Sequence, residues 1–471
     1  MKGEGKYVGR VTWLHTESSQ TQAVIPEATG PFYSTVKVDD PIRLWSGSLE
    51  ILQKQKLSKG FAVIRMVWPP RPDIAVSVRL RKGAALPGIG QAEIWIPSLG
   101  ARARATVDQV SVSGGRGARA PRITCSLSED LRIGPGVNVA SVVFHLPNFR
   151  QYIGLPVRQG TRQSASRAVL EAAGWRVVLD QAHHLNEGIL ADLQQARGYA
   201  ITHVGRLERV SGEIFDVAVL PGFMNALGYF LSFCQGNWVA PILSVGMDRG
   251  GGRIWEEWGS RRVERWAAVN SWLSEFEPHA MGAAFPGFIR RWHTELWQEP
   301  LRLAMHWYVE SNRCAGGVEG ALVLAQVAFE LLTWTLLVEE RKALSKKSFK
   351  GTSAGGRLRM LLETCGLDTR IPDSLSALVE LAGTYASADG PGIITHVRNE
   401  TVHPEPSAQK AMIQLRPRIR YEAWRFALWY LELILLRLFD YEGKYSSRVN
   451  PSPFRGGELE AVHWASGNPP S

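Results

Sequence analysis

The feature that most constrains this chain of 471 residues is a change of hydrophobic spacing partway along it. Before about residue 215, short segments rich in Val, Ile and Thr alternate apolar and polar side chains, and turns containing Gly and Pro separate them. From about residue 263 onward, apolar residues recur at helical spacing. Because one element cannot follow both periods, the sequence predicts a β-rich part followed by a helical part.

The β-rich part favours an antiparallel sandwich or barrel over a doubly wound sheet, because its strands are short and closely spaced. The predicted strands are 11–14, 75–80, 92–96, 105–112, 122–126 and 137–144. A mixed stretch follows, in which we expect a helix at 166–173, a strand at 175–179 and a helix at 189–196. A helix at 223–233 ending near Gly236, and a strand at 238–245, then lead into the helical part.

The helical part has eight candidate helices: 263–276, 285–299, 301–312, 318–343, 354–365, 374–385, 393–402 and 413–441. The predicted fold class is therefore α+β and multidomain, with an N-terminal antiparallel β-rich, sandwich-like domain followed by an all-α bundle. We divide the chain into a β-rich sensor or regulatory domain at 1–215, a mixed connecting region at 216–300, a helical domain at 301–445 and a poorly ordered tail at 446–471.

Composition limits the cellular setting. The four cysteines form no CxxC pair, so we expect free thiols in a reducing compartment, with no metal and no cofactor. The N-terminus has no apolar signal core. The apolar stretch 321–338 holds Gln326 and Glu330, and a carboxylate at the centre of a bilayer costs roughly 2.5–3.5 kcal/mol. We therefore expect a buried helix, no membrane contact and a cytoplasmic protein.

One constellation carries chemistry. Arg398-Asn399-Glu400-Thr401-Val402-His403-Pro404 follows a Gly-Pro-Gly turn, and Pro404 should end the helix near His403. Five residues on an ideal helix leave Arg398 and His403 about 140° apart around the axis. Either His403 leaves the helix, or a second copy of the motif completes the site across a homodimer.

This Arg-Asn-x-x-x-His motif resembles the Arg-x(4–6)-His signature of HEPN domains, the helical fold of many prokaryotic ribonucleases. The order of helices over about 301–445 is similar too: a long apolar helix with the internal acid Glu330, then a basic segment, the motif helix and a last amphipathic helix. A β-rich front half joined to such a domain resembles ApeA-like phage-defence proteins.

The resemblance implies metal-independent cleavage of RNA, with tRNA as one candidate, by an anti-phage, abortive-infection or toxin effector. His403 would act as general acid or base. Arg398 would stabilise charge on the phosphoryl oxygens, and Asn399 would orient the phosphate or the imidazole. For Glu330 we favour a supporting role in pairing with Arg398 or another basic group. A homodimer and a phage-derived trigger or an antitoxin would be its protein partners.

The segment 341–360 has seven basic residues and no Asp or Glu, which is typical of a phosphate-contacting surface. We expect it to be a mobile loop. Its candidate RNA-binding residues are Lys346, Lys347, Lys350, Arg357 and Arg359.

Two alternatives remain open. The helical domain could be a non-catalytic HEPN module for dimerisation and for binding RNA or a nucleotide, with a ligand-sensing β domain in front of it. Alternatively, the β domain could be the principal ligand-binding part, with the helices as a scaffold. Seven tryptophans between residues 255 and 307 favour core packing over a base-stacking surface.

Overall fold

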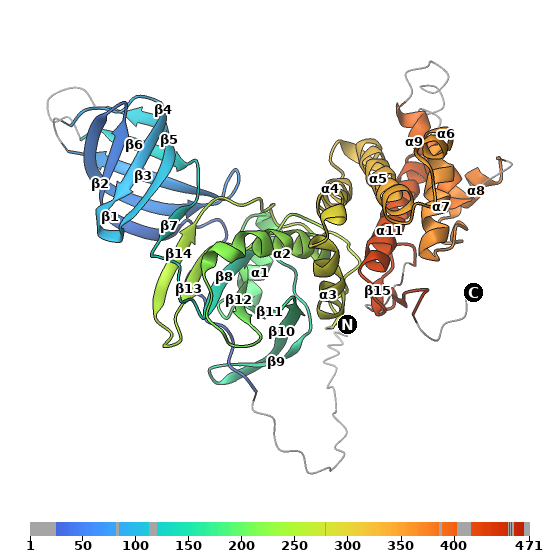
Figure 1. The fold of residues 1–471 in the computed structure, drawn as a ribbon, viewed down its shortest axis with the longest axis horizontal. Helices are drawn as coiled ribbons and strands as arrows, with labels where there is room; N and C mark the ends of the chain where they lie inside the picture. Colours follow the sequence, from blue (N-terminus) through green and yellow to red (C-terminus); the bar gives the residue numbers. More distant parts are fainter. Residues whose placement is uncertain are drawn as a thin grey trace, which may run out of the picture.

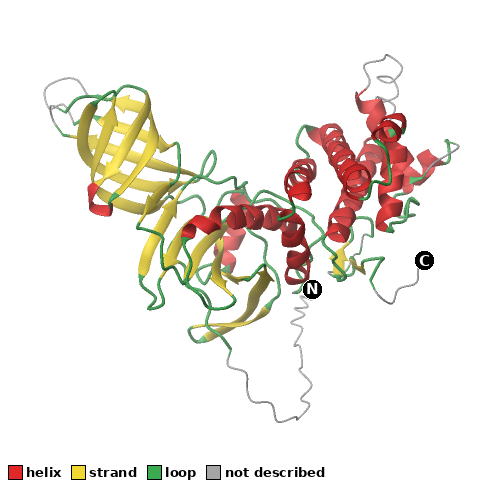
Figure 2. Cartoon of the chain, viewed as in Figure 1, coloured by secondary structure: helices red, strands yellow, loops and turns green. Residues whose placement is uncertain are grey.

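The computed structural model describes residues 25–81, 84–112, 120–277, 279–385, 389–402, 416–450, 452, 454 and 456–465. Along the described chain, a barrel, a large sheet and a helical bundle follow one another (Figure 1). Strands dominate one end of the molecule and helices the other (Figure 2). The predicted α+β multidomain class is therefore confirmed.

Six strands form a closed antiparallel barrel in the order β1-β2-β3-β6-β5-β4. These are β1 (Ile42–Gln53), β2 (Lys56–Val67), β3 (Asp73–Leu80), β4 (Gly90–Ile96), β5 (Ala101–Ser111) and β6 (Arg122–Leu127). Lys54 and Gln55 join β1 to β2, and both have positive φ, as a two-residue hairpin turn requires. Alternate residues of each strand face the barrel core, which matches the alternation in the sequence.

The central sheet has eight antiparallel strands in the order β7-β14-β13-β8-β12-β11-β10-β9. They are β7 (Leu131–Ile133), β8 (Ser141–Pro147), β9 (Leu155–Gln159), β10 (Arg162–Ala172), β11 (Trp175–Gln181), β12 (Ile201–Arg209), β13 (Ile242–Met247) and β14 (Arg253–Trp258). The sheet therefore crosses residue 215, where the sequence placed a domain boundary. Trp68 of the barrel side stacks on Tyr199 beside β12, with ring centroids 5.7 Å apart, so barrel and sheet share a hydrophobic cluster.

The helices are α1 (Glu187–Ala196), α2 (Leu220–Gln235), α3 (Ala280–Trp292), α4 (Glu295–Asn312), α5 (Gly317–Thr333), α6 (Lys346–Gly351), α7 (Ala354–Cys365), α8 (Ser376–Ala382), α9 (Gly390–Val402) and α11 (Pro417–Leu438). Helix α5 continues into a π-helical segment, Trp334–Glu340. One hydrophobic core runs from the sheet through α2 and α3 into this bundle. A Cβ on Gly287 of α3 would lie 1.7 Å from the backbone oxygen of Phe439, so glycine permits this close approach to the end of α11.

Two predicted helices are wrong. The segment 166–173 lies in β10, because its backbone pairs with β9 and β11 and its alternate residues Ala168 and Leu170 point into the core. The segment 263–276 is not helical. Its backbone groups pair with distant segments instead: Glu264 N–H donates to Trp238, and the carbonyl of Trp272 accepts from Ser446. Tertiary pairing overrides helical spacing in both places.

The tail and the basic segment are also more ordered than expected. Strand β16 (Leu459–Ala461) lies in the stretch 446–471 that we expected to be poorly ordered, and it pairs with β15 (Lys444–Ser446). Ser345 caps α6 by accepting from the N–H of Ser348, so part of the expected mobile loop is a short helix.

The stretch 321–338, expected to be a buried helix, lies in α5 and the π-helical segment that continues it. Two segments, Val217–Gln235 and Gly317–Glu340, are long and apolar enough to cross a membrane, but 56% and 67% of their most apolar windows are buried inside the protein. Both belong to the continuous core, and core helices of this kind meet the same length and composition criteria.

Candidate active site at the end of helix α9

Helix α9 carries the Arg-Asn part of the motif. Asp389 lies just before its first turn and accepts a hydrogen bond from the N–H of Gly392 at 2.9 Å. Ile393, Ile394 and Val397 are buried against the bundle. This anchoring places Arg398 and Asn399, which are both half-buried, near the C-terminal end of the helix.

Arg398 is half-buried and only partly satisfied by the described residues. Its Nη1 donates to Asn399 Oδ1 at 3.1 Å, whereas its Nε is buried with no hydrogen-bond partner among the described residues. None of the ion pairs of the described chain involves Arg398. The side chain therefore presents a positive charge that no carboxylate within the described ranges neutralises.

His403, the predicted general acid or base, lies outside the described residues, as does Pro404. The last described residue of the helix is Val402. The meeting of Arg398 with His403 therefore stays a prediction, and so does a composite site across a dimer.

Glu330 has a partner, but it is not Arg398. Its Oε2 lies 3.0 Å from Arg357 Nε, and its Oε1 accepts a hydrogen bond from Gln326 Nε2 at 3.0 Å. The Arg357 Nε–H makes no aligned hydrogen bond, so the Arg357 contact is a charge pair. This arrangement gives Glu330 a structural role in joining α5 to α7.

The five candidate RNA-binding residues fall into two groups. Arg359 is held by Asp389 through two contacts of 2.5 and 2.8 Å, and Arg357 is held by Glu330. The three lysines of α6 are exposed, and only Lys346 has an ion-pair partner among the described residues, Glu339 at 3.9 Å. Among these five residues, the charge without an ion-pair partner in the described ranges therefore lies on Lys347 and Lys350 of α6.

The packing of α7 on α9 brings that charge to the Arg398 end. Gly355 of α7 lies against Pro391 and Thr395 of α9, whereas Arg359, one turn later, contacts Asp389 before α9. The two helices are therefore antiparallel. Helix α6, which precedes α7, lies at the same end of the bundle as the C-terminus of α9 (Figure 1).

Sequence reasoning missed Asp389, which both caps α9 and holds Arg359. Its signal was available, since an Asp before Gly-Pro-Gly is a typical helix start. The partner of Glu330 could not be identified from the sequence, because Arg398 and other basic groups were all possible before their positions in space were known.

The sheet and the helical bundle each match a described domain type. Residues 134–269 match the YopA central domain, and residues 294–458 match the YopA C-terminal domain. The chain is also 27% identical over 359 residues to the SPbeta prophage-derived uncharacterized protein YopA of Bacillus subtilis (strain 168), over 76% of this chain and 79% of that protein. No solved structure matches the chain. The first match covers most of the central sheet, and the second covers α9 and its surroundings.

Proposed function

We propose that this protein is a metal-independent endoribonuclease of the HEPN type, with tRNA as the first substrate to test. The observation that carries the proposal is the guanidinium of Arg398, which has no carboxylate partner among the described residues although it is half-buried. A half-buried positive charge without an internal partner suits an anionic ligand. The exposed lysines of α6 at the same end of the bundle supply further attraction for a phosphate backbone.

The proposed reaction needs no group beyond these side chains and the RNA. The ribose 2′-oxygen attacks the adjacent phosphorus, and the bond from phosphorus to the 5′-oxygen breaks. His403 transfers the proton, taking it from the 2′-hydroxyl and giving it to the leaving 5′-oxygen. Arg398 stabilises the charge on the phosphoryl oxygens, with Asn399 holding its Nη1 in place. The products are a 2′,3′-cyclic phosphate and a 5′-hydroxyl.

The biological role that we propose is that of an anti-phage or toxin effector in the cytoplasm, acting as a homodimer. The Bacillus subtilis relative is prophage-derived, which fits a role connected with phage. The barrel and sheet in front of the bundle would then respond to a phage-derived trigger or an antitoxin.

The test is cleavage of tRNA by the full chain in the presence of EDTA. We expect wild-type protein to cut and His403→Ala to be inactive. His396→Ala is the matched control on the same helix, because His396 packs on Tyr385 with ring centroids 4.4 Å apart and lies 3.9 Å from Glu400; this variant should still cut. Cleavage that requires a divalent metal or survives His403→Ala would contradict the mechanism. Tight binding without cleavage would favour a non-catalytic RNA-binding module.

A further inference from the structure

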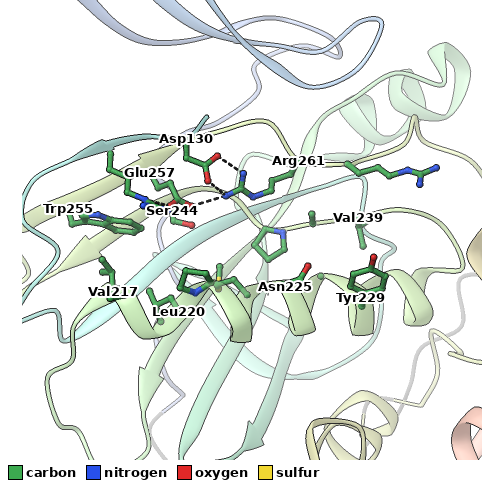
Figure 3. A pocket seen from close by; sticks show the side chains of 18 of the residues that line it. Asp130, Val217, Leu220, Asn225, Tyr229, Val239, Ser244, Trp255, Glu257 and Arg261 are labelled. Atoms are coloured by element: carbon green, nitrogen blue, oxygen red, sulfur yellow. Dashed lines mark hydrogen bonds and ion pairs between the residues drawn. The ribbon is translucent and has the colours of Figure 1, made fainter. Parts of the chain in front are cut away.

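A cavity of about 660 Å³ lies between α2 and the edge of the central sheet formed by β7, β14 and β13 (Figure 3). Its size falls within the range of roughly 300–1,000 Å³ that is usual for small-molecule sites. Leu220, Met224 and Gly228 follow one face of α2 at intervals of four residues and form the floor. Trp255 closes one end, and Tyr229 and Val239 lie toward the other.

The charged groups around this cavity balance one another. The lining contains three acidic residues and three arginines. Arg261 is held by Asp130 at 2.7 and 2.9 Å and by Glu257 at 2.9 Å, and Arg132 contacts the second oxygen of Glu257 at 3.0 Å. Figure 3 shows the carboxylates turned toward Arg261 rather than toward the floor.

The two remaining charged residues are satisfied as well. Asp216 accepts from the N–H of Ala218 at 2.8 Å. Arg262 pairs with Glu310 and lies over the ring of Trp238, 4.4 Å from its centroid. A charged ligand would have to displace one of these partners or remain uncompensated at the cavity wall, so the lining selects against it.

Two buried residues of the lining have a polar side-chain group without a partner in the described part of the chain. Ser244 and Trp255 are only 8% and 5% exposed. Within the described ranges, neither the hydroxyl of Ser244 nor the indole N–H of Trp255 has a hydrogen-bond partner. Both residues line the cavity, and an acceptor on a molecule bound there would satisfy these two donors. The aromatic side chains at both ends provide flat apolar surfaces for a ring.

We propose that this cavity binds a neutral, partly aromatic small molecule that carries a hydrogen-bond acceptor. The site is independent of the proposed nuclease chemistry at α9. An occupant would also touch the helical bundle, because His306 of α4 is part of the lining and its ring lies 5.5 Å from that of Trp238. The Nε1 of Trp238 donates to Glu310 of the same helix at 2.7 Å. The cavity therefore spans the junction between the central sheet and α4.

The test compares two fluorescent probes with the same aromatic skeleton. Methyl 6-(dimethylamino)-2-naphthoate is neutral and carries a carbonyl acceptor, whereas 6-(dimethylamino)-2-naphthoate keeps the skeleton and adds one negative charge. The full chain should bind the neutral probe saturably at one site and the anionic probe at least about tenfold more weakly, which corresponds to about 1.4 kcal/mol. Equal affinity for both probes, or no saturable binding of the neutral one, would overturn the proposal.

Gly228→Leu locates the binding. A Cβ at Gly228 would meet Pro241 at 3.7 Å and Ala240 at 3.9 Å, so the substitution fits locally and its side chain extends into the cavity. We expect at least about a tenfold loss of affinity for the neutral probe. Gly222→Leu is the matched control on α2, because Gly222 is exposed, lies outside the lining and has nothing within 4 Å of an added Cβ; its affinity should be unchanged.

Circular dichroism and thermal melting establish that the variants are folded. If Gly228→Leu fails to fold, Met224→Trp fills the cavity floor one turn earlier on α2 and should lower the affinity for the neutral probe in the same way. An affinity that stays at the wild-type value in the folded floor variant, or falls equally in Gly222→Leu, would place the probe elsewhere and refute the assignment.

Discussion

The two candidate sites of this protein differ in how they treat charge. In the cavity between α2 and the central sheet, here called the junction cavity, each Asp, Glu and Arg side chain of the lining has an ion-pair or hydrogen-bond partner within the protein. At the end of α9, Arg398 has no ion-pair partner among the described residues, and exposed lysines lie at the same end of the bundle. The comparison indicates that the cavity suits a neutral molecule, whereas the α9 end suits an anion.

The same contrast distinguishes Arg398 from a fully paired arginine of the bundle. Arg448 and Glu432 form a fully closed pair, with side chains 4% and 0% exposed and contacts of 2.7 and 2.8 Å. The hydroxyl of Tyr308 donates to Glu432 at 2.5 Å. An arginine in such a setting holds the fold together, and Arg398, which lacks it, is available for another task.

Arg448→Ala should have the largest effect on stability. It leaves the carboxylate of Glu432 buried without its cation, which typically costs about 3–5 kcal/mol in the free energy of unfolding. Arg398→Ala is the matched comparison and should cost less than about 1 kcal/mol, because no buried carboxylate loses its partner. Urea unfolding followed by circular dichroism measures both. Equal losses in the two variants would remove the distinction between a closed and an open arginine.

The free energy of unfolding should fall at acidic pH because His145 is buried in the central sheet. The Nε2 of His145 accepts from the backbone N–H groups of Phe32 and Tyr33, both at 3.1 Å, while its Nδ1 lies 3.1 Å from the carbonyl oxygen of Leu243. Burial lowers the pKa of His145 to about 4. As the pH falls below about 6.5, the unfolded chain therefore binds a proton on His145 that the folded protein does not bind. The contribution of His145 to the free energy of unfolding is fully present above about pH 6.5, and about 3 kcal/mol of it is lost as the pH falls to about 4.

His145→Gln should flatten this loss, whereas His183→Gln should keep it, because His183 is exposed. Burial also lowers the pKa of His203, to about 3, so part of the slope should remain in both variants. Unfolding in urea at several pH values between 4 and 7 provides the measurement. A slope that is unchanged in His145→Gln would show that this buried imidazole does not govern acid sensitivity.

Glu330→Gln should have the smallest effect. Its partner Arg357 is 20% exposed and Glu330 itself 29%, so water screens the pair, and its loss should cost at most about 1 kcal/mol. Cleavage of RNA should stay close to the wild-type rate, because Glu330 supports α7 and does not pair with Arg398. A large loss of cleavage in a Glu330→Gln protein of normal stability would indicate a catalytic role for Glu330 and would contradict the structural role inferred from its pairing with Arg357.

The sequence predicted those features that depend on local patterns. The change of period separated the β-rich part from the bundle. The helix expected at 393–402 is present as α9, which begins three residues earlier, so that Gly-Pro-Gly forms its first turn. The sequence prediction failed where hydrogen bonds to other segments decide the secondary structure. Residues 166–173 have helical spacing but form part of β10, because β9 and β11 pair with them on both sides. The buried position of Arg448 was also invisible, because its partner Glu432 lies on a helix that appeared merely amphipathic.

The candidate sites show the same limit. Arg398 and Asn399 became candidates because their motif resembles the HEPN signature, and the structure adds that the side chains of these two residues contact each other. The junction cavity brings together residues from Asp130 to His306, a separation that no short pattern spans. Its charge balance depends on ion pairs between β7, β14 and the segment after β14, which exist only once the sheet has formed.

The central claim is that the open guanidinium of Arg398 acts on a phosphodiester. The most direct measurement is the single-turnover rate of tRNA cleavage in EDTA by Arg398→Ala and by Arg290→Ala, whose arginine on α3 is paired with Asp440 at 2.6 Å. Loss of transition-state charge stabilisation should slow Arg398→Ala about 100- to 1,000-fold and leave Arg290→Ala at the wild-type rate. A wild-type rate in folded Arg398→Ala would contradict the claim.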